Sequence, residues 1–288
     1  MERLDGKTSV KLEFGKKKTA TVLSASCWHY GNQSVSEEGI HNFLTKAKKH
    51  PWIHHGDMVE GITRKDVRFS IDEHKDSLLD SANMAIESIK KARKTCIGVI
   101  KGNHDDTPSK EIGDLADFIA VHAGVKYLTA TCFVRYKCPK GTATGFYAHG
   151  SGGSNPRSGD PERKQLNRQI WLRNLLSQFK ADICGIGHTH HFIVTPPCSE
   201  ERLCIGDEAN IKRRPVSTRP GWYYAAPSMF QSYNLHADVG NYAEMKLYGA
   251  TAMGWIETVF NQDGTIGCVR EVYHTGVTKQ EWTPRIVG

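Results

Sequence analysis

Five short polar clusters stand out because each places metal-binding side chains directly after an apolar run. They are Cys27-Trp28-His29, Gly56-Asp57, Gly102-Asn103-His104-Asp105, Ala148-His149-Gly150 and Gly187-His188-Thr189-His190. The apolar runs have the length and composition of buried strands. Ligand sites in α/β proteins assemble at the carboxyl ends of strands, so we expect the five clusters to converge on one site.

The side chains in these clusters are those of a site for two metal ions. Asp57 would bridge two cations through its two carboxylate oxygens, Asn103 would offer a neutral oxygen, and the imidazoles would be neutral nitrogen ligands. Two cations ~3.5–4 Å apart hold the attacking and leaving oxygens of a displacement at phosphorus. The clusters together indicate hydrolysis of a phosphate ester.

Each cluster taken alone has a simpler explanation. A histidine after a strand is more often a hydrogen-bonded structural residue than a ligand, and Asp57 or Asn103 beside glycine could belong to a turn. The order of all five clusters favours the metal site. His54, His55 and His191 adjoin the clusters, and we expect them to support the ligands or lie on the surface.

In their order, the clusters resemble the motifs of the calcineurin-like metallophosphoesterases. That family carries D-x-H, G-D, G-N-H-[DE], a histidine next to glycine, and G-H-x-H, and this chain matches all five with one substitution, at Cys27. The match runs from about residue 20 to residue 190. The resemblance implies an α/β sandwich of two mixed β-sheets flanked by helices, and a metal-dependent hydrolase acting on phosphoric ester bonds.

The resemblance also implies a role for each site residue, with two divalent ions (Mn, Zn or Fe) as cofactors. The first ion would be held by Cys27, His29, Asp57 and His190, and the second by Asp57, Asn103, His149 and His188. His104 would stabilise the substrate phosphate or protonate the leaving oxygen, and Asp105 would orient the His104 ring. A hydroxide bridging the metals would be the nucleophile.

Cysteine at position 27 is the one departure, since the family has aspartate there. A thiolate is a softer ligand and favours Zn²⁺ or iron over Mn²⁺ or Mg²⁺. Three interpretations stay open. Cys27 ligates the first metal, or it stands aside and leaves that metal weakly bound or absent, or the chain is a catalytically inactive descendant.

Strands and helices alternate along the chain and would position these clusters. We expect strands near 10–14, 19–26, 52–55, 96–100, 126–128, 132–136, 145–149, 182–186, 222–229, 255–260 and 266–273. We expect helices after Ser36, over 72–94 and 111–122, and after Asp160. The first two strands would form a hairpin around 15–17 and the last two a hairpin around 263–264. No linker divides the chain, so we expect one domain over 1–288, with an irregular insertion at about 196–220.

The composition fits a soluble globular protein. With 288 residues, 39% of them hydrophobic and 24% charged, wholesale disorder is excluded, and no apolar run approaches the ~20 residues of a membrane-spanning helix. The eight cysteines contain no C-x-x-C pair, and the first residues form no apolar segment. We therefore expect free thiols, a cytoplasmic location and no membrane partner.

Three functions remain open at this stage. The first is a phosphodiesterase or nuclease, which the net charge of +7, the basic run Lys212-Arg213-Arg214 and a looser resemblance of 163–190 to DNA-repair nucleases favour. The second is a phosphomonoesterase acting on a nucleotide, metabolite or phosphoprotein. The third is a non-catalytic scaffold with a degenerate metal site. The glycine-serine run at 151–154 lacks the lysine of a P-loop, so nucleoside triphosphate binding there is excluded.

Overall fold

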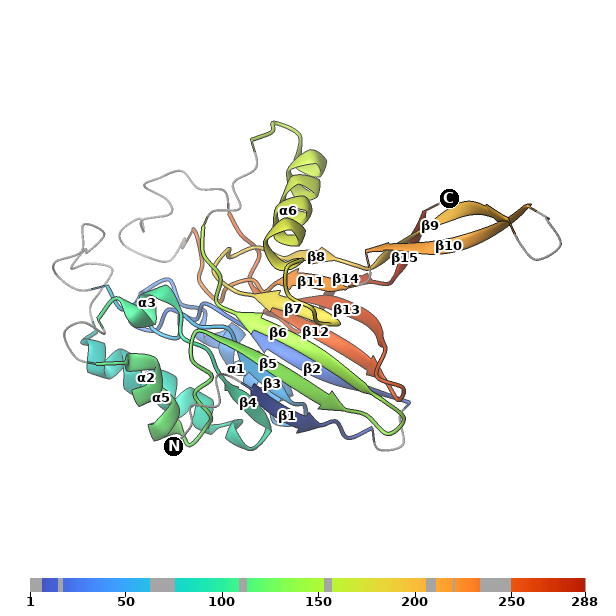
Figure 1. Cartoon of the computed structure of the whole chain (residues 1–288). Coiled ribbons are helices and arrows are strands. Elements are labelled where there is room, and N and C mark those ends of the chain that lie inside the picture. The colour runs from blue at the N-terminus through green and yellow to red at the C-terminus, as the bar shows by residue number, and fades with distance from the viewer. Residues whose placement is uncertain are drawn as a thin grey trace.

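The computed structural model describes residues 7–14, 18–62, 76–108, 113–152, 157–205, 211–219, 221–233 and 250–287. In these residues, two six-stranded β-sheets lie against each other, and helices cover their outer faces (Figure 1). The expected α/β sandwich of two mixed sheets is confirmed.

The first sheet has the strand order β14-β13-β12-β2-β3-β4. Three of its strands are parallel: β2 (Thr19–Ala25), β3 (Trp52–His54) and β4 (Cys96–Val99). The others continue the sheet in antiparallel pairs: β12 (Gly254–Asn261), β13 (Ile266–Tyr273) and β14 (Thr278–Trp282). The expected hairpin around 263–264 is confirmed as the β12–β13 connection, with Gly264 at φ +89°.

The second sheet has the order β1-β5-β6-β7-β11-β8. Its strands are β1 (Lys7–Lys11), β5 (Thr131–Lys137), β6 (Thr142–Ala148), β7 (Ile183–Ile186), β8 (Ile193–Thr195) and β11 (Trp222–Ala225). β6 and β7 run parallel, and so do β7 and β11. Residues 126–128, expected as a strand, contribute only an isolated bridge between Val99 and Tyr127.

The expected opening hairpin is wrong, because β1 and β2 lie in different sheets. β1 pairs in parallel with β5, placing Lys7 opposite Phe133. β2 is a central strand whose two edges are occupied by β12 and β3, so no edge is left for β1. The proposed turn at 15–17 lies outside the described residues.

The expected irregular insertion at 196–220 is also wrong, since most of this segment is regular. β9 (Cys198–Ile205) and β10 (Ile211–Arg219) pair antiparallel, and β15 (Arg285–Val287) runs parallel to β9. These strands form a separate three-stranded sheet that projects from the sandwich (Figure 1). Pro215 inside β10 and the polar start of β9 hide the alternation by which a strand is recognised.

Three helices cover the first sheet: α1 (Glu37–Ala47), α2 (Leu78–Lys90) and α5 (Leu115–Ala123). Ser36 caps α1 as expected, since its Oγ accepts a hydrogen bond from the Gly39 N–H at 3.2 Å. α2 begins later than expected, after Ser77, and residues 63–75 lie outside the description. α6 (Pro161–Leu176) covers the second sheet and begins at the expected Asp160 cap.

The core between the sheets is apolar but contains three buried tyrosines whose hydroxyls are paired. The hydroxyl of Tyr136 lies 2.8 Å from that of Tyr147, and Tyr224 bonds Ser24 Oγ at 2.7 Å. The Tyr224–Ser24 bond joins β11 to β2 across the sandwich. None of the described helices is both long and apolar enough to cross a bilayer. The seven cysteines with described side chains are free thiols, and the side chain of Cys204 lies outside the description.

Candidate metal centre

The five polar clusters meet at one end of the sandwich, in the segments after β2, β3, β4, β6 and β7. Nε2 of His29 lies 3.1 Å from Nε2 of His190. Oδ2 of Asp57 lies 3.0 Å from Nε2 of His149, and Oδ1 of Asn103 lies 2.9 Å from Nδ1 of His188. Side chains from both sheets therefore share one site.

Three overlapping groups of potential ligand atoms occur there, and within each group the atoms lie within 4.8 Å of one another. They are Cys27 with His29 and His190, Cys27 with Asp57 and His149, and His29 with Asp57 and His104. Asp57, Cys27 and His29 each belong to two groups. A bridging carboxylate between two cations requires such a shared position.

The backbone of the site is held in an uncommon conformation. Outside glycine, six described residues have positive φ, and five of them belong to the predicted ligands: Cys27, His29, Asp57, His188 and His190. The left-handed region costs free energy for residues with a Cβ and persists where the surroundings enforce it. Here the segments after β2 and β3 brace each other, since Asp57 O accepts hydrogen bonds from the N–H groups of Trp28 (2.8 Å) and His29 (3.2 Å).

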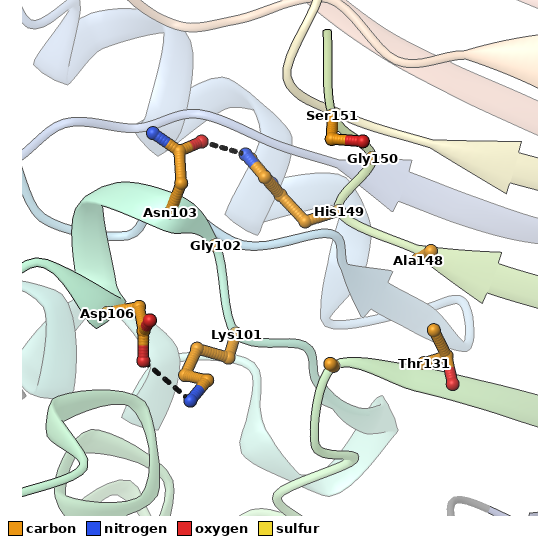
Figure 2. A pocket seen from close by; sticks show the side chains of 10 residues that line it. Lys101, Gly102, Asn103, Asp106, Thr131, Ala148, His149, Gly150 and Ser151 are labelled. Carbon is orange, nitrogen blue, oxygen red and sulfur yellow. Dashed lines mark hydrogen bonds and ion pairs between the residues drawn. The ribbon is translucent and has the colours of Figure 1, made fainter.

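The ring of His149 directs a nitrogen lone pair at two oxygen acceptors. Its Nδ1 donates to the carbonyl oxygen of His55 at 2.6 Å, which leaves Nε2 as the acceptor in the neutral ring. Nε2 nevertheless lies 3.0 Å from Asp57 Oδ2 and 3.0 Å from Asn103 Oδ1, as Figure 2 shows for Asn103. Three acceptors facing one another require a proton or a cation between them. An N–H donated to a backbone carbonyl is also typical of a metal-binding histidine.

His29 has the same arrangement on the other side of the site. Its Nδ1 lies 2.9 Å from the Glu60 carboxylate, and its Nε2 faces Nε2 of His190. The carboxylate fixes Nδ1 as the protonated nitrogen, so Nε2 points its lone pair toward His190 and Cys27 unless a second proton is bound. His29 and His149 thus mark two separate positions for a positive charge.

The pKa directions agree with this geometry. Burial lowers the pKa of His149, but the Asp57 carboxylate outweighs burial and raises it to about 9. Burial likewise opposes protonation of His29, yet Glu60 and Cys27 raise its pKa well above its usual value. Burial would raise the pKa of Asp57, but the neighbouring histidines hold it well below its usual range. A carboxylate and two proton-attracting imidazoles form a site that favours added cations.

The other imidazoles are kept neutral. Burial lowers the pKa of His188, and it lowers that of His190 well below its usual value, with nearby histidines adding to both effects. A neutral imidazole is the form that ligates a metal. The sulfur, nitrogen and oxygen donors present therefore fit divalent cations.

Asp105 does not orient the His104 ring as expected. Its carboxylate accepts four backbone hydrogen bonds, listed here with their distances: Asp57 N–H (2.8 Å), Met58 N–H (3.0 Å), Val59 N–H (3.3 Å) and Gly102 N–H (2.9 Å). Asp105 is fully buried, and burial together with the charge of Asp57 raises its pKa to about 6. This carboxylate fastens the segment after β3 to the segment after β4.

Glu60 holds the His104 ring instead. Its carbonyl oxygen accepts a hydrogen bond from His104 Nδ1 at 2.6 Å, and its carboxylate lies 3.5 Å from the same nitrogen. From the sequence, Glu60, three residues after Asp57, could either support the ligands or be exposed. The available signal was a charged residue at the end of the otherwise apolar run Met58-Val59, where the structure buries the carboxylate.

Two of the histidines that adjoin the clusters are buried beneath the site. His55 supplies the carbonyl oxygen that fixes His149, and its own Nε2 lies 3.0 Å from the hydroxyl of Tyr224. His54 Nδ1 accepts a hydrogen bond from the Gly56 N–H at 3.1 Å. His191 is half-buried and lies 3.2 Å from an Arg168 guanidinium nitrogen. His55 therefore supports a predicted ligand directly, whereas the contacts of His54 and His191 are to Gly56 and Arg168.

A pocket of about 360 Å³ opens beside Asn103 and His149 (Figure 2). Its other walls include Lys101, Asp106, Thr131 and Ser151, along with alanines and glycines. Lys101 Nζ lies 2.7 Å from Asp106 and 3.5 Å from Asp114, so its charge is neutralised within the protein. The pocket therefore offers hydroxyl and backbone groups and the Lys101–Asp106 ion pair, without a free positive charge from Lys101.

No protein-family model matches this chain, and no curated protein sequence matches it. Solved structures with a similar backbone arrangement include a predicted phosphoesterase from Streptococcus pneumoniae. It has 11% sequence identity and a TM-score of 0.38, and the match covers 92% of this chain and 98% of that chain. A metallophosphoesterase from Sphaerobacter thermophilus has 13% identity and a TM-score of 0.37, covering 84% of this chain and 83% of that one. The GAP50 anchor in the inner membrane complex of Plasmodium has 9% identity and a TM-score of 0.43, covering 93% and 89%. At these values the similarity carries no functional argument.

Proposed function

We propose that this protein is a metal-dependent phosphoesterase. The position of Asp57 is the observation that carries the proposal. Its Oδ2 faces His149, and the groups containing Asp57 reach His29 and His104 on one side and Cys27 and His149 on the other. One buried carboxylate between two sets of imidazoles is the arrangement needed to hold two cations close together.

The residues divide into two ligand sets that share Asp57. His29 and His190 lie on one side, and Asn103, His149 and His188 lie on the other. Divalent cations, when bound here, supply a nucleophile by lowering the pKa of water and offset the charge that develops on the phosphate. Glu60 and the His55 carbonyl keep His29 and His149 in the tautomer that ligates through Nε2.

His104 is the proposed proton-transfer residue. Its Nδ1 is committed to the Glu60 carbonyl, so Nε2 is the atom that exchanges a proton with the substrate. Burial lowers the pKa of His104, while Asp57 and Glu60 oppose that effect. A phosphate arriving beside Nε2 adds negative charge and favours the protonated ring, which then donates to the leaving oxygen.

The substrate proposed is a phosphodiester, with nucleic acid as one source. The pocket beside Asn103 and His149 gives room for a group beyond the scissile phosphate, and Lys101 in its wall is already paired. A diester carries one negative charge at its phosphate, whereas a monoester brings up to two and gains more from an unpaired cation. The net charge of +7 favours an anionic substrate.

The test pairs metal analysis with two chromogenic substrates, bis-p-nitrophenyl phosphate and p-nitrophenyl phosphate. Purified protein is stripped with a chelator, reloaded with Mn²⁺, Zn²⁺ or Fe²⁺, and assayed on both compounds and on single-stranded DNA. We expect turnover that is lost on stripping and restored by metal, with the diester preferred. His104→Ala should retain metal and lose most turnover, while His41→Ala, an exposed histidine on α1, should match the parent. Preference for the monoester would overturn the diester proposal, and full turnover after stripping would overturn the function itself.

A further inference from the structure

We propose that the thiolate of Cys27 is a metal ligand placed between the two cation positions, so that this centre selects Zn²⁺ or Fe²⁺ over Mn²⁺ and Mg²⁺. This inference rests on the proposed function only in that the centre must bind cations. It selects the first of the three interpretations of Cys27 left open by the sequence.

The first argument is the location of Sγ. The Cys27 sulfur lies within 4.8 Å of ligand nitrogens of His29 and His190, and also within 4.8 Å of ligand atoms of Asp57 and His149. A cysteine that stood aside from the metals would not belong to both groups. Asp57 and His29 are the other residues shared between groups, so a sulfur, a carboxylate and an imidazole together occupy the middle of the site.

The second argument is that the backbone is fixed in a conformation that aims this side chain. Cys27 has φ +52°, a left-handed conformation that costs free energy for a residue with a Cβ. Its N–H donates to Gly56 O at 2.9 Å, and its carbonyl accepts from Met229 N–H at 3.1 Å. The side chain is fully buried. Position and direction are thus imposed by the segments on either side.

The third argument is the polar support for the sulfur. Ser26 Oγ lies 3.0 Å from Sγ and, by donating its proton, would stabilise a thiolate. Ser26 has room only because residue 187 is glycine, since a Cβ at Gly187 would lie 1.8 Å from Ser26 Oγ. In contrast, Cys132 and Cys184 pack within apolar clusters, where a buried thiol behaves as a small hydrophobic group.

Ligand chemistry then sets the metal preference. Thiolate with imidazole suits Zn²⁺ and iron, whereas Mn²⁺ and Mg²⁺ prefer oxygen ligands. A metal-bound thiolate carries the same single negative charge that a carboxylate would carry at this position. Cysteine in place of aspartate at position 27 therefore makes this ligand softer and leaves the charge of the site unchanged.

The test uses spectroscopy and does not depend on turnover. Zinc-loaded protein is examined by X-ray absorption, where a bound thiolate gives a sulfur neighbour at ~2.3 Å. Cobalt-loaded protein is examined for a thiolate-to-cobalt charge-transfer band in the near ultraviolet. We expect both signals in the parent and in Cys138→Ser, which replaces a half-buried cysteine directly after β5. Both signals should vanish in Cys27→Asp.

Metal competition provides the second measurement. In Cys27→Asp the ratio of the Zn²⁺ affinity to the Mn²⁺ affinity should fall by at least ~10-fold. Mutation of residues that only hydrogen-bond to metal ligands already changes metal affinity by that much. If metal binds to the parent without a sulfur neighbour, the inference is overturned and the phosphoesterase proposal stands. If the parent binds no divalent ion at all, the proposed function fails as well. The X-ray absorption of the parent decides the matter even where the variant does not fold.

Discussion

Oδ2 of Asp57 lies 3.0 Å from Nε2 of His149, and this contact joins the two sheets of the sandwich. Asp57 follows β3 in one sheet and His149 follows β6 in the other. His149 uses its other nitrogen to donate to the His55 carbonyl, so the contact sets a lone pair against a carboxylate unless a positive charge intervenes. The assembly of the sandwich therefore brings together the two side chains of the proposed cation site.

Glu60→Gln should weaken the metal position next to His29. The carboxylate that faces His29 Nδ1 is lost, while the backbone carbonyl that holds His104 is retained. We expect a loss of ~10–100-fold in affinity for one of two metal ions, as is usual for outer-shell partners. Titration with a metal indicator measures it. The control is Glu87→Gln, which removes an exposed carboxylate on α2, and equal affinities in the two variants would contradict the role of Glu60.

Asp105→Ala should destabilise the metal-free protein strongly. Four backbone N–H groups lose their acceptor in a buried place, and each unsatisfied donor costs ~1–3 kcal/mol. We expect a fall of at least ~3 kcal/mol in the free energy of unfolding after local relaxation. The neighbouring Asp106→Ala breaks only an exposed pair with Lys101 and should cost ~0–1 kcal/mol. Urea denaturation measures the free energy of unfolding of both variants. Similar losses in the two would show that Asp105 does not hold the segments after β3 and β4 together.

Gly102→Ala should displace Asp57 without removing any ligand. A Cβ at position 102 would lie 2.1 Å from Asp57 Oδ1 and 2.2 Å from Asp57 N, so the segment after β3 must move. We expect the variant to lose at least ~10-fold in metal affinity. Gly159→Ala is the matched control, because a Cβ there meets nothing within 4 Å. Unchanged metal binding in Gly102→Ala would show that the placement of Asp57 is not critical.

Alkaline pH should destabilise the core through Tyr136 and Tyr147. Burial raises the pKa of both phenols, so the folded protein favours their neutral forms. Their contribution to stability is complete below the unfolded-state pKa of ~10 and is lost as pH rises above that value. The free energy of unfolding, measured by denaturation between pH 8 and 11, should fall above ~10. The decline should be smaller in Tyr136→Phe, and an identical pH profile would contradict the argument.

The sandwich was implied by the family resemblance of the five clusters. The meeting place of the clusters could be predicted from the residues themselves, because apolar runs that end in glycine and polar residues mark strand ends. The sequence does not predict which strands pair with each other in the sheets. β1 was expected to pair with β2, but the apolar pattern of β2 is equally that of a central strand with both edges occupied. β9 and β10 lack the regular alternation of a half-buried strand, so their pairing was missed.

Within the site, the candidate ligands can be predicted from the sequence, but the residues that hydrogen-bond to them and hold the loops in place cannot. Cys27, His29, Asp57 and His190 stand next to strand ends in the sequence, as they do in the structure. The roles of Glu60 and Asp105 depend on how two loops cross. Asp105 turns toward four backbone N–H groups and leaves His104 to the Glu60 carbonyl, which no residue pattern encodes.

The most direct test of the central claim is the metal stoichiometry of the purified, reconstituted protein compared with that of Asp57→Asn. Elemental analysis after dialysis should find two divalent ions per parent chain and a loss of at least ~100-fold in affinity for the pair in the variant, since both positions use the same carboxylate. Asp117→Asn, on α5, should keep both ions. A parent chain with no bound ion, or an Asp57→Asn variant that retains two with unchanged affinity, would contradict the account.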